Sequence, residues 1–253
     1  MPHQAEIIAV GTELLLGNIA NTNAQFLSQL LASAGVNVLY HTAVGDNPQR
    51  LRAAVETARS RCDLLVFTGG LGPTYDDMTK ETVAGVFGLA LEYHPEVMEE
   101  IQQYFDRVFH RPMPACNRQQ AMLPQGCTVL HNPVGTAPGC IFTAGGVTAV
   151  LLPGVPHECR YLAEHAVLPW LRGQSGGVIR SRDLHVFGLT EPQVQELLGD
   201  LMDGAQNPSL APYAKPGEVM LRLSAWPLCS GTSAPGWETI CTAWTFPPWR
   251  RWS

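Results

Sequence analysis

Short apolar runs alternate with helix-like segments over about the first 170 residues of this 253-residue chain. Runs of five or six mostly apolar residues are typical of strands buried on both faces; here they are Ala5–Val10, Val36–Tyr40 and Asp63–Thr68. The segments that follow them space their apolar residues as one face of a helix does: Thr22–Ala34, a helix from Pro48, and Met78–Phe87. Because alternating strands and helices are typical of a parallel sheet covered on both faces, the sequence predicts an α/β fold with a mostly parallel sheet.

The rest of this first domain is less regular. Pro95–His110 has the spacing of an amphipathic helix, and Cys140–Leu152 is typical of two strands around a Gly-Gly turn. The segment P-G-V-P then leads into a helix that extends to about Leu171. Because Arg172–Gly177, R-G-Q-S-G-G, has the composition of a linker, residues 1–172 are predicted to form one domain.

A small α+β module is predicted over residues 178–224. Val178–Phe187 is strand-like, a T-x-x-Q capping pattern at Thr190 and Gln193 opens an amphipathic helix, and Gly217–Ala225 is another strand. The final segment, 225–253, holds five of the six tryptophans of the chain and four prolines, without apolar periodicity. It does not fit either predicted domain.

Composition excludes several classes of protein. The apolar content is 45%, the mean hydropathy is +0.01, and no run approaches the roughly 18 apolar residues of a membrane helix. The N-terminus lacks a signal-peptide pattern, so we expect a cytoplasmic protein. A net charge of −6, with Lys80 and Lys215 as the two lysines, argues against a nucleic-acid partner. Seven scattered cysteines without a C-x-x-C motif indicate reduced thiols.

The stretch V-F-T-G-G-L-G-P-T-Y-D-D-M-T-K-E-T, Val66–Thr82, carries the main candidate chemistry. Three glycines follow a predicted strand, two adjacent aspartates (Asp76 and Asp77) follow the glycines, and a helix begins directly afterwards. Glycine backbone and a helix N-terminus attract anions, whereas carboxylates repel them unless a cation lies between. The stretch therefore predicts phosphate and metal chemistry. Two simpler interpretations stay open: Asp77 caps the helix, and the glycines only form a tight turn.

Polar residues also follow the first two predicted strands. They are Thr12, Glu13, Asn21 and Asn23, which follow Gly11 after the first strand, and Asp46 after the second. Ligands of parallel sheets bind beyond the carboxyl ends of the strands, so these residues and the glycine loop are predicted to converge. Asparagine, threonine and aspartate are also common turn and cap residues, and Asp46 or Asn47 could cap the helix from Pro48.

Three consecutive residues, His157, Glu158 and Cys159, are of metal-ligand type. Neighbouring residues on a helix point in different directions, so we do not expect them to bind a metal together. No serine or cysteine of the chain has the surroundings of a catalytic nucleophile.

Six motifs, in order, resemble those of the CinA family (competence/damage-inducible protein A), and the likeness extends from about Ala5 to Ser224. They are AEIIAVGTELLLGNIANTNAQFLSQLL, TAVGDN, VFTGGLGPTYDDMTKETVA, NRQQAMLPQG, NPVGTAPG and LLPGVPHE. The N-terminal domain of that family is similar to the molybdopterin-binding fold of molybdenum-cofactor biosynthesis. In those relatives a T-G-G-T-G loop and a downstream aspartate handle a phosphoanhydride with magnesium.

The resemblance implies a metal-dependent pyrophosphatase that converts ADP-ribose to AMP and ribose 5-phosphate. It implies that Asp77 and Asp46 are catalytic and hold a divalent ion (Mg, Mn or Co). Leu71 stands where the relatives have the second threonine of the loop. The residues that it assigns to the small-molecule nucleotide substrate are Gly11, Thr12, Glu13, Asn21, Thr68, Gly69, Gly70, Gly72, Pro73, Thr74, Lys80, Pro153 and Gly154. The alternative interpretation of Lys80 is a solvated lysine that contacts no phosphate.

Two other function classes stay open. The first is a module that binds a pterin or nucleotide phosphate without hydrolysis, or transfers an adenylyl group as its relatives do. The second is a partner protein in DNA uptake or recombination, which the acidic composition disfavours. Related folds are often oligomeric, so the resemblance also implies a homo-oligomer.

The resemblance includes a KH-like linker domain, to which the second module corresponds. That module lacks a G-x-x-G loop and basic residues, so RNA binding does not transfer to it. Many family members also carry a C-terminal domain that deamidates nicotinamide mononucleotide, and we expect this chain to lack it.

The tail suggests a frameshift. W-E-T-I-C-T-A-W-T-F-P-P-W-R-R-W can be encoded so that the frame one base earlier reads L-G-D-Y-M-Y-G-M-D-V-P-T-V-E-E-V, which resembles the family's own continuation. We hypothesise a frameshift between Ser224 and Trp237 that leaves the small domain incomplete and exposes apolar residues. A gene sequence without such a second frame would refute this hypothesis.

Overall fold

The computed structural model describes residues 3–174, 180–203, 209–215 and 217–225. The chain divides into two compact units, Met1–Gly176 and Gly177–Ser253. The tail 226–253, with the hypothesised frameshift, lies outside the described residues, as do the end of the predicted linker and the first residues of the strand predicted from Val178.

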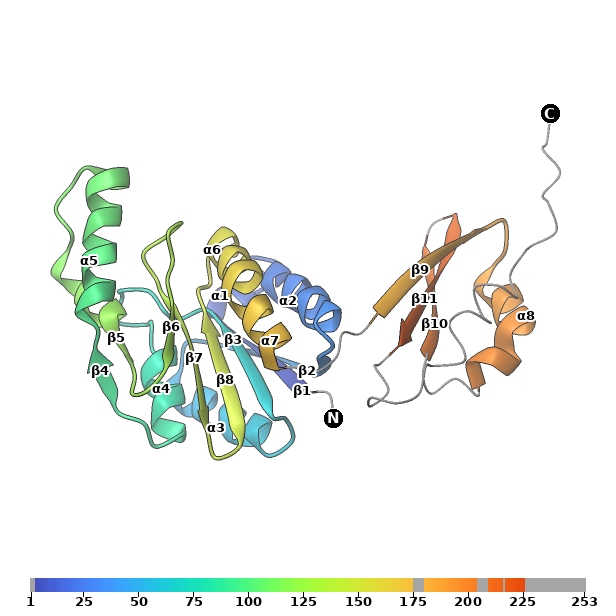
Figure 1. Cartoon of the computed structure of the whole chain (residues 1–253), viewed down its shortest axis with the longest axis horizontal. Helices are drawn as coiled ribbons and strands as arrows, with labels where there is room; N and C mark the ends of the chain where they lie inside the picture. Colours follow the sequence, from blue (N-terminus) through green and yellow to red (C-terminus); the bar gives the residue numbers. More distant parts are fainter. Residues whose placement is uncertain (1–2, 175–179, 204–208, 216, 226–253) are drawn as a thin grey trace. The chain divides into compact units, whose positions relative to one another are not determined.

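The first unit is built on a six-stranded sheet (Figure 1). In spatial order its strands are β2 (Asn37–Val44), β1 (Gln4–Val10), β3 (Leu64–Thr68), β8 (Val147–Leu152), β7 (Gly139–Ala144) and β6 (Thr128–Leu130). The first four are parallel, β7 is antiparallel to β8, and β6 is antiparallel to β7. This confirms the predicted mostly parallel sheet and the hairpin around the Gly-Gly turn.

Helices cover both faces of the sheet (Figure 1). They are α1 (Thr12–Leu15), α2 (Thr22–Ser33), α3 (Pro48–Arg59), α4 (Thr79–Val86), α5 (Pro95–Tyr104), α6 (Pro156–Leu162) and α7 (Leu168–Gln174). A 3-10 helix, Ala115–Ala121, and the strand pair β4 (Leu91–Tyr93) and β5 (Met122–Pro124) complete the unit.

The sheet has one hydrophobic core on each face because side chains alternate along a strand. On β1, Ile7 packs with Leu27 and Leu31 of α2, whereas Ile8 packs on the other face with Leu51 and Val55 of α3. Residues on both faces are therefore buried, and the central strands are continuous apolar runs in the sequence.

Two predicted helices are less regular than their periodicity indicated. The α-helix from Pro95 ends at Tyr104; a π-helical turn, Phe105–Phe109, follows, and His110 ends it in the left-handed conformation (φ 50°). The helix after P-G-V-P is divided into α6, a π-helical turn and α7. Pro169 lacks an N–H group, so it cannot extend the regular hydrogen-bond ladder there. Helix α7 extends to Gln174, into the predicted linker.

The second unit has a three-stranded antiparallel sheet in the order β10 (Ser209–Lys215), β11 (Glu218–Ala225), β9 (Arg180–Phe187). Helix α8 (Glu191–Asp203) contributes Val194 and Leu198 to a small core shared with β11. The Thr190 N–H donates to Gln193 Oε1 at 2.9 Å, which confirms the predicted capping pattern. No helix in the described parts of the chain has the length and apolar character needed to cross a membrane.

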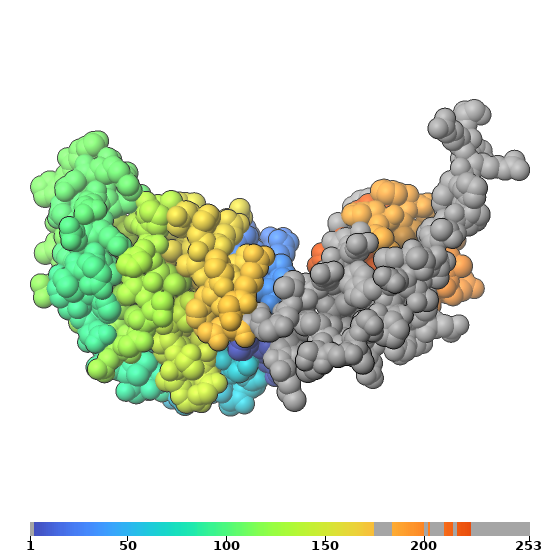
Figure 2. Space-filling view, in the orientation of Figure 1, coloured from blue at the N-terminus to red at the C-terminus, as the bar shows by residue number. Residues whose placement is uncertain are grey.

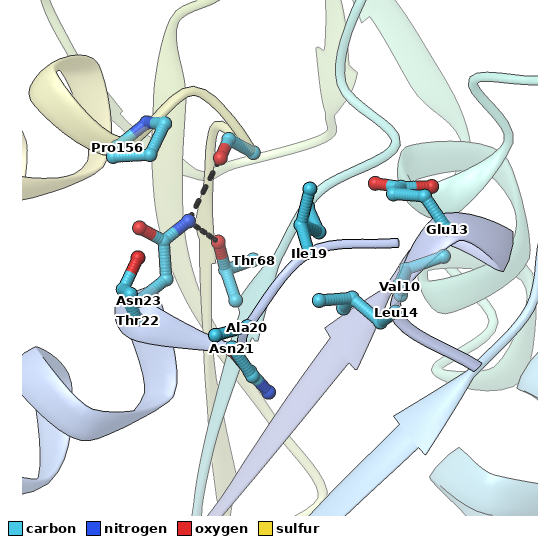
Figure 3. A pocket seen from close by; sticks show the side chains of 11 residues that line it. Val10, Glu13, Leu14, Ile19, Ala20, Asn21, Thr22, Asn23, Thr68 and Pro156 are labelled. Carbon is cyan, nitrogen blue, oxygen red and sulfur yellow. Dashed lines mark hydrogen bonds between the residues drawn. The ribbon is translucent and has the colours of Figure 1, made fainter. Parts of the chain in front are cut away.

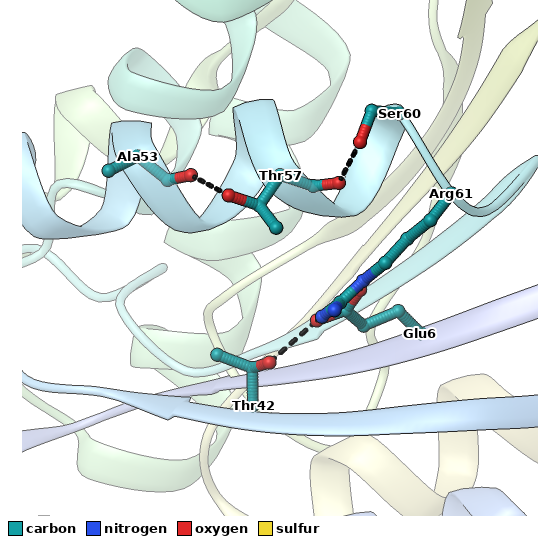
Figure 4. A network of polar contacts seen from close by, with 6 residues as sticks. All are labelled: Glu6, Thr42, Ala53, Thr57, Ser60 and Arg61. Atoms are coloured by element: carbon teal, nitrogen blue, oxygen red, sulfur yellow. Dashed lines mark hydrogen bonds and ion pairs between the residues drawn. The ribbon is translucent and has the colours of Figure 1, made fainter.

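A buried acidic residue joins β1 to the turn after α3. Glu6 is 1% exposed, and its carboxylate accepts hydrogen bonds from Arg61 Nε at 2.9 Å and Nη2 at 2.8 Å (Figure 4). Thr42 Oγ1 on β2 donates to the same carboxylate at 2.6 Å. The turn that carries Arg61 is held by Ser60 Oγ, which donates to the Thr57 carbonyl at 2.7 Å. Paired donors of this kind offset the cost of burying the charge.

Removing the arginine would leave the Glu6 carboxylate buried without its cation. We expect Arg61→Ala to lower the free energy of unfolding by about 2–4 kcal/mol, measured by chemical denaturation. The matched control is Arg50→Ala on the exposed side of α3, which should change it by less than about 0.5 kcal/mol. Equal effects of the two substitutions would show that the Glu6 pair contributes nothing specific.

Candidate functional site

The carboxyl ends of β1, β3 and β8 meet at Gly69. Its N–H donates to the Leu152 carbonyl of β8 at 3.1 Å, and a Cβ at this position would overlap the Val10 carbonyl oxygen of β1. Gly69 also has a left-handed φ of 101°. Gly154 approaches from the loop after β8, where its own Cβ would lie 3.2 Å from Gly69 Cα. Only glycine fits this backbone contact without strain.

The next glycines pack against the start of α4. Thr79 Oγ1 donates to the Gly69 carbonyl at 2.9 Å, and the Thr79 N–H donates to the Gly70 carbonyl at 3.1 Å. A Cβ at Gly70 would overlap Thr79 Oγ1, and one at Gly72 would overlap the Asp77 carboxylate. The glycines therefore form a closely packed turn, as one sequence interpretation held, and the same packing holds the loop against the helix N-terminus.

Asp77 belongs to the loop and does not cap α4. The residue at the N-cap position is Met78, whose side chain makes no capping hydrogen bond. Asp77 Oδ2 instead accepts from the Thr74 N–H at 2.9 Å and from Thr74 Oγ1 at 2.6 Å, and Asp76 Oδ1 also accepts from that hydroxyl. The interpretation of Asp77 as a helix cap is wrong, because the loop already fixes its carboxylate. Pro73 lies half-buried within the same loop.

Asp46 is likewise not a helix cap. Asn47 caps α3, since its Oδ1 accepts from the Arg50 N–H at 2.9 Å. Asp46 pairs with the first residue of α1: the Thr12 N–H donates to Asp46 Oδ2 at 2.8 Å, and the Asp46 N–H donates to Thr12 Oγ1 at 3.1 Å. The N–H of Gly11 donates to the Val44 carbonyl at 2.9 Å. The structure thus brings Gly11, Thr12 and Asp46 together as the sequence predicts.

Asn23 connects three segments of the site. Its Nδ2 donates to Thr68 Oγ1 at 3.0 Å and to the Gly154 carbonyl at 2.8 Å (Figure 3). Thr68 Oγ1 in turn donates to the Pro153 carbonyl at 3.0 Å. Asn21 serves as the N-cap of α2, since it accepts from the Ala24 N–H at 3.1 Å. These bonds hold the β1–α2 connection against the ends of β3 and β8.

Lys80 lies beneath the glycine loop. It is 2% exposed, so the interpretation of a solvated lysine is wrong. Its Nζ donates to the Gln119 carbonyl at 2.6 Å, and Gln119 Nε2 donates to the carbonyls of Gly72 at 3.2 Å and Thr74 at 2.9 Å. Burial lowers the pKa of Lys80 to about 8, and the nearby Glu81 and Asp77 oppose this shift. In this structure Lys80 contacts the loop through Gln119.

The sequence indicates Asn23 as one of the polar residues after the first strand, but it does not indicate Thr79 or Gln119 as site residues. Thr79 stands in the motif D-D-M-T-K-E-T and Gln119 in the motif N-R-Q-Q, and both motifs belong to the resemblance to the CinA family. Neither periodicity nor composition indicates that Gln119, some 39 positions after Lys80, would bond the glycine loop. The signal was therefore the motif alone.

The segment after P-G-V-P supports the rejection of a joint metal site. The Glu158 carboxylate is buried and accepts from Asn132 Nδ2 at 2.6 Å, while burial raises its pKa. Burial also raises the pKa of the Cys159 thiol to about 11, so it is protonated at neutral pH. His157, by contrast, is exposed. The three side chains have different surroundings, as their consecutive spacing implied.

The oxygen atoms of Asp77 and Asp46 are the donors of the site that suit a divalent ion. In the described part of the chain, no group of three or more His, Cys, Asp or Glu side chains is placed to hold a metal. Mg²⁺ in proteins is commonly held by one or two carboxylates, with phosphate and water oxygens completing the coordination. Asp77 and Asp46 each supply carboxylate oxygens of the kind that such an ion takes as ligands.

Comparisons with known proteins identify the family. The family model "Probable molybdopterin binding domain" matches residues 6–173, and "Damage-inducible protein CinA KH domain" matches residues 181–228. The crystal structure of CinA, of unknown function, from Thermoplasma acidophilum is 35% identical with a TM-score of 0.62, covering 67% of this chain and 98% of that one. The chain belongs to the CinA family.

The CinA-family assignment agrees with the motifs of the first unit and with the capped helix of the second. Putative competence-damage inducible proteins from Acetivibrio thermocellus and Bacillus thuringiensis (strain Al Hakam) are each 51% identical to it. The alignments cover 87% of this chain and 53% and 54% of those proteins. The chain thus spans about half the length of these curated relatives.

The contact at Gly69 can be tested by substitution. We expect Gly69→Ala to lower the free energy of unfolding by about 3 kcal/mol or more, because the added carbon overlaps the Val10 carbonyl as well as straining φ. The control is Gly126→Ala, which has a similar φ of 72° and no atom within 4 Å of its added carbon. Gly126→Ala should lower the free energy of unfolding by only about 1–2 kcal/mol, which is the cost of the left-handed conformation for a residue with a Cβ. Equal losses in denaturation would disprove the close approach.

The buried lysine predicts a pH-dependent stability. Its folded pKa of about 8 lies below the ordinary value of 10.5, so the unfolded chain binds more protons between these values. Stability contributed through Lys80 therefore rises with pH across that window, by on the order of 3 kcal/mol. We expect the free energy of unfolding of wild type, relative to Lys80→Met, to increase from pH 8 to pH 10. A constant difference would show that the lysine is not desolvated.

Proposed function

We propose that this CinA-family protein is a metal-dependent hydrolase of a nucleotide diphosphate, with ADP-ribose as substrate and AMP and ribose 5-phosphate as products. The observation that carries the proposal is the loop between β3 and α4, where glycine backbone, a helix N-terminus and a fixed carboxylate occur together. An anion and a cation are needed to satisfy such a loop, and a metal-bound diphosphate supplies both.

The loop offers unpaired donors for a diphosphate. Among the described residues, the N–H groups of Gly70 and Gly72 donate to no acceptor. Lys80 and Gln119 hold the loop from below, and Thr79 holds it from the helix, so these donors are fixed before a ligand binds. A preorganised set of donors stabilises developing negative charge without reorganisation during the reaction.

In the proposed function, Asp77 and Asp46 bind the divalent ion. Neither carboxylate caps α3 or α4. The Asp77 carboxylate accepts hydrogen bonds from the N–H and the hydroxyl of Thr74 in the same loop, and the Asp46 carboxylate accepts one from the Thr12 N–H at the start of α1. When bound, such an ion offsets the charge of the diphosphate and makes water a better nucleophile. Gly11, Glu13 and Asn21, at the ends of the neighbouring elements, are assigned to the rest of the substrate.

The alternative is a module that binds a pterin or nucleotide phosphate, or transfers an adenylyl group, without hydrolysis. The description of the family model over residues 6–173, a probable molybdopterin binding domain, supports this class. The same loop serves both functions because each requires a bound phosphate. Turnover of ADP-ribose separates them. Self-association, a cytoplasmic location and the absence of a nucleic-acid partner stay predictions.

The function is tested by AMP release from ADP-ribose with magnesium, manganese or cobalt. We expect metal-dependent release by wild type and a loss of roughly 100-fold or more in kcat/KM for Asp77→Asn and Asp46→Asn, since each loses a charge that holds the ion. Asp106→Asn, which removes an exposed carboxylate after α5, is the matched control and should be active.

No release by folded wild-type protein, together with retained phosphate-dependent binding of a nucleotide, would favour the binding module. Release that is unchanged in both variants would place the chemistry elsewhere in the chain.

A further inference from the structure

A pocket of about 70 Å³ lies beside the glycine loop, between the β1–α2 connection and the loop after β8 (Figure 3). Its apolar walls come from Val10, Leu14, Ile19 and Pro156, and its polar groups include Glu13 and Thr22. We propose that this pocket binds the purine base of the substrate and selects a base that carries an exocyclic amino group. This inference rests on the proposed function, because it assigns the base of the same nucleotide.

The pocket adjoins the position assigned to the diphosphate. It is lined by Thr68, the residue directly before Gly69, and by Gly154, whose backbone approaches Gly69 closely. Asn23 fixes both of these walls through its two hydrogen bonds. When the phosphates of a nucleotide lie on the glycine loop, its base or its sugar can therefore reach this pocket.

Apolar side chains in the pocket favour the base over the sugar. Ile19 lines the pocket and is nevertheless 53% exposed, and its neighbours Leu15 and Leu16 are exposed as well. A planar ring laid against Ile19 would remove apolar surface from water, which is favourable. A ribose presents hydroxyl groups that would lose hydrogen bonds to water against the same walls.

Glu13 supplies the selectivity. Its carboxylate lies against Gly11, where a Cβ would be 2.5 Å from Glu13 Oε1, so the glycine permits this position. An ionised carboxylate only accepts hydrogen bonds and repels anions. It therefore suits the amino group of adenine and disfavours both a phosphate and the carbonyl oxygen of hypoxanthine.

The base preference is tested with ADP-ribose and its inosine analogue, IDP-ribose. Wild type should prefer ADP-ribose by roughly tenfold or more in kcat/KM, because the analogue places a carbonyl where the carboxylate needs a donor. Glu13→Gln should reduce this preference toward unity, since an amide can also donate. A wild type without preference, or a preference unchanged in Glu13→Gln, would overturn the inference.

The apolar wall is tested separately. Ile19→Ala should raise KM for ADP-ribose several-fold with little change in kcat. This result is expected because the contact with the base is equally strong in the ground state and in the transition state. Leu16→Ala removes a neighbouring exposed leucine outside the pocket and should leave KM unchanged. Equal KM values for wild type and Ile19→Ala would overturn the assignment of the base to this pocket.

Binding of AMP and IMP, measured by calorimetry, makes the test independent of turnover. If wild type releases no AMP from ADP-ribose, the proposed hydrolase fails, but AMP should still bind more tightly than IMP and more weakly to Ile19→Ala. Absent AMP binding, or binding that neither the base nor Ile19→Ala alters, would overturn the pocket assignment itself.

Discussion

The site depends on the close approach of three strand ends at Gly69. The backbone of β1 leaves no room for a side chain there, β8 accepts the Gly69 N–H, and Gly154 packs on its α-carbon. Because the carboxyl ends of β1, β3 and β8 are held so near one another, the loops that follow them converge on one edge of the sheet. That convergence places the glycine loop, the β1–α2 connection and the turn after β8 around a common space.

A second constraint is the electrostatics of the loop. Two aspartates, Asp76 and Asp77, accept hydrogen bonds from a single threonine, while the cation nearest to them in sequence is buried beneath the loop. Burial removes water from the Lys80 ammonium group and so destabilises its charged form, which lowers its pKa. The buried lysine thus acts on the loop through Gln119, and the exposed side of the loop keeps acidic oxygens that suit a cation.

These features give one account of binding and selectivity. In the proposed function the fixed backbone donors bind phosphate oxygens and the aspartates bind a cation, while the pocket beside them offers apolar walls with a carboxylate acceptor. These groups lie on different segments of the chain. A hydrogen bond from Asn23 Nδ2 to Thr68 Oγ1 joins the start of α2 to the end of β3. The second unit has its own small core around Val194 and Leu198.

The sequence by itself determined the mostly parallel sheet, the alternation of its first three strands with α2, α3 and α4, and the convergence of Asp46, Thr12 and the glycine loop on strand ends, because apolar runs and helical spacing are local patterns. It did not indicate the short elements α1, β4, β5 and β6, nor β10 in the second unit. It also identified the family through motifs that stand in order. Tertiary structure alone decided that Asp77 and Asp46 are not helix caps, that Lys80 is buried, and that Asn23 and Gln119 tie the loops together. Those facts depend on contacts between residues distant in the chain, and no local pattern encodes which of several possible partners a polar side chain will meet.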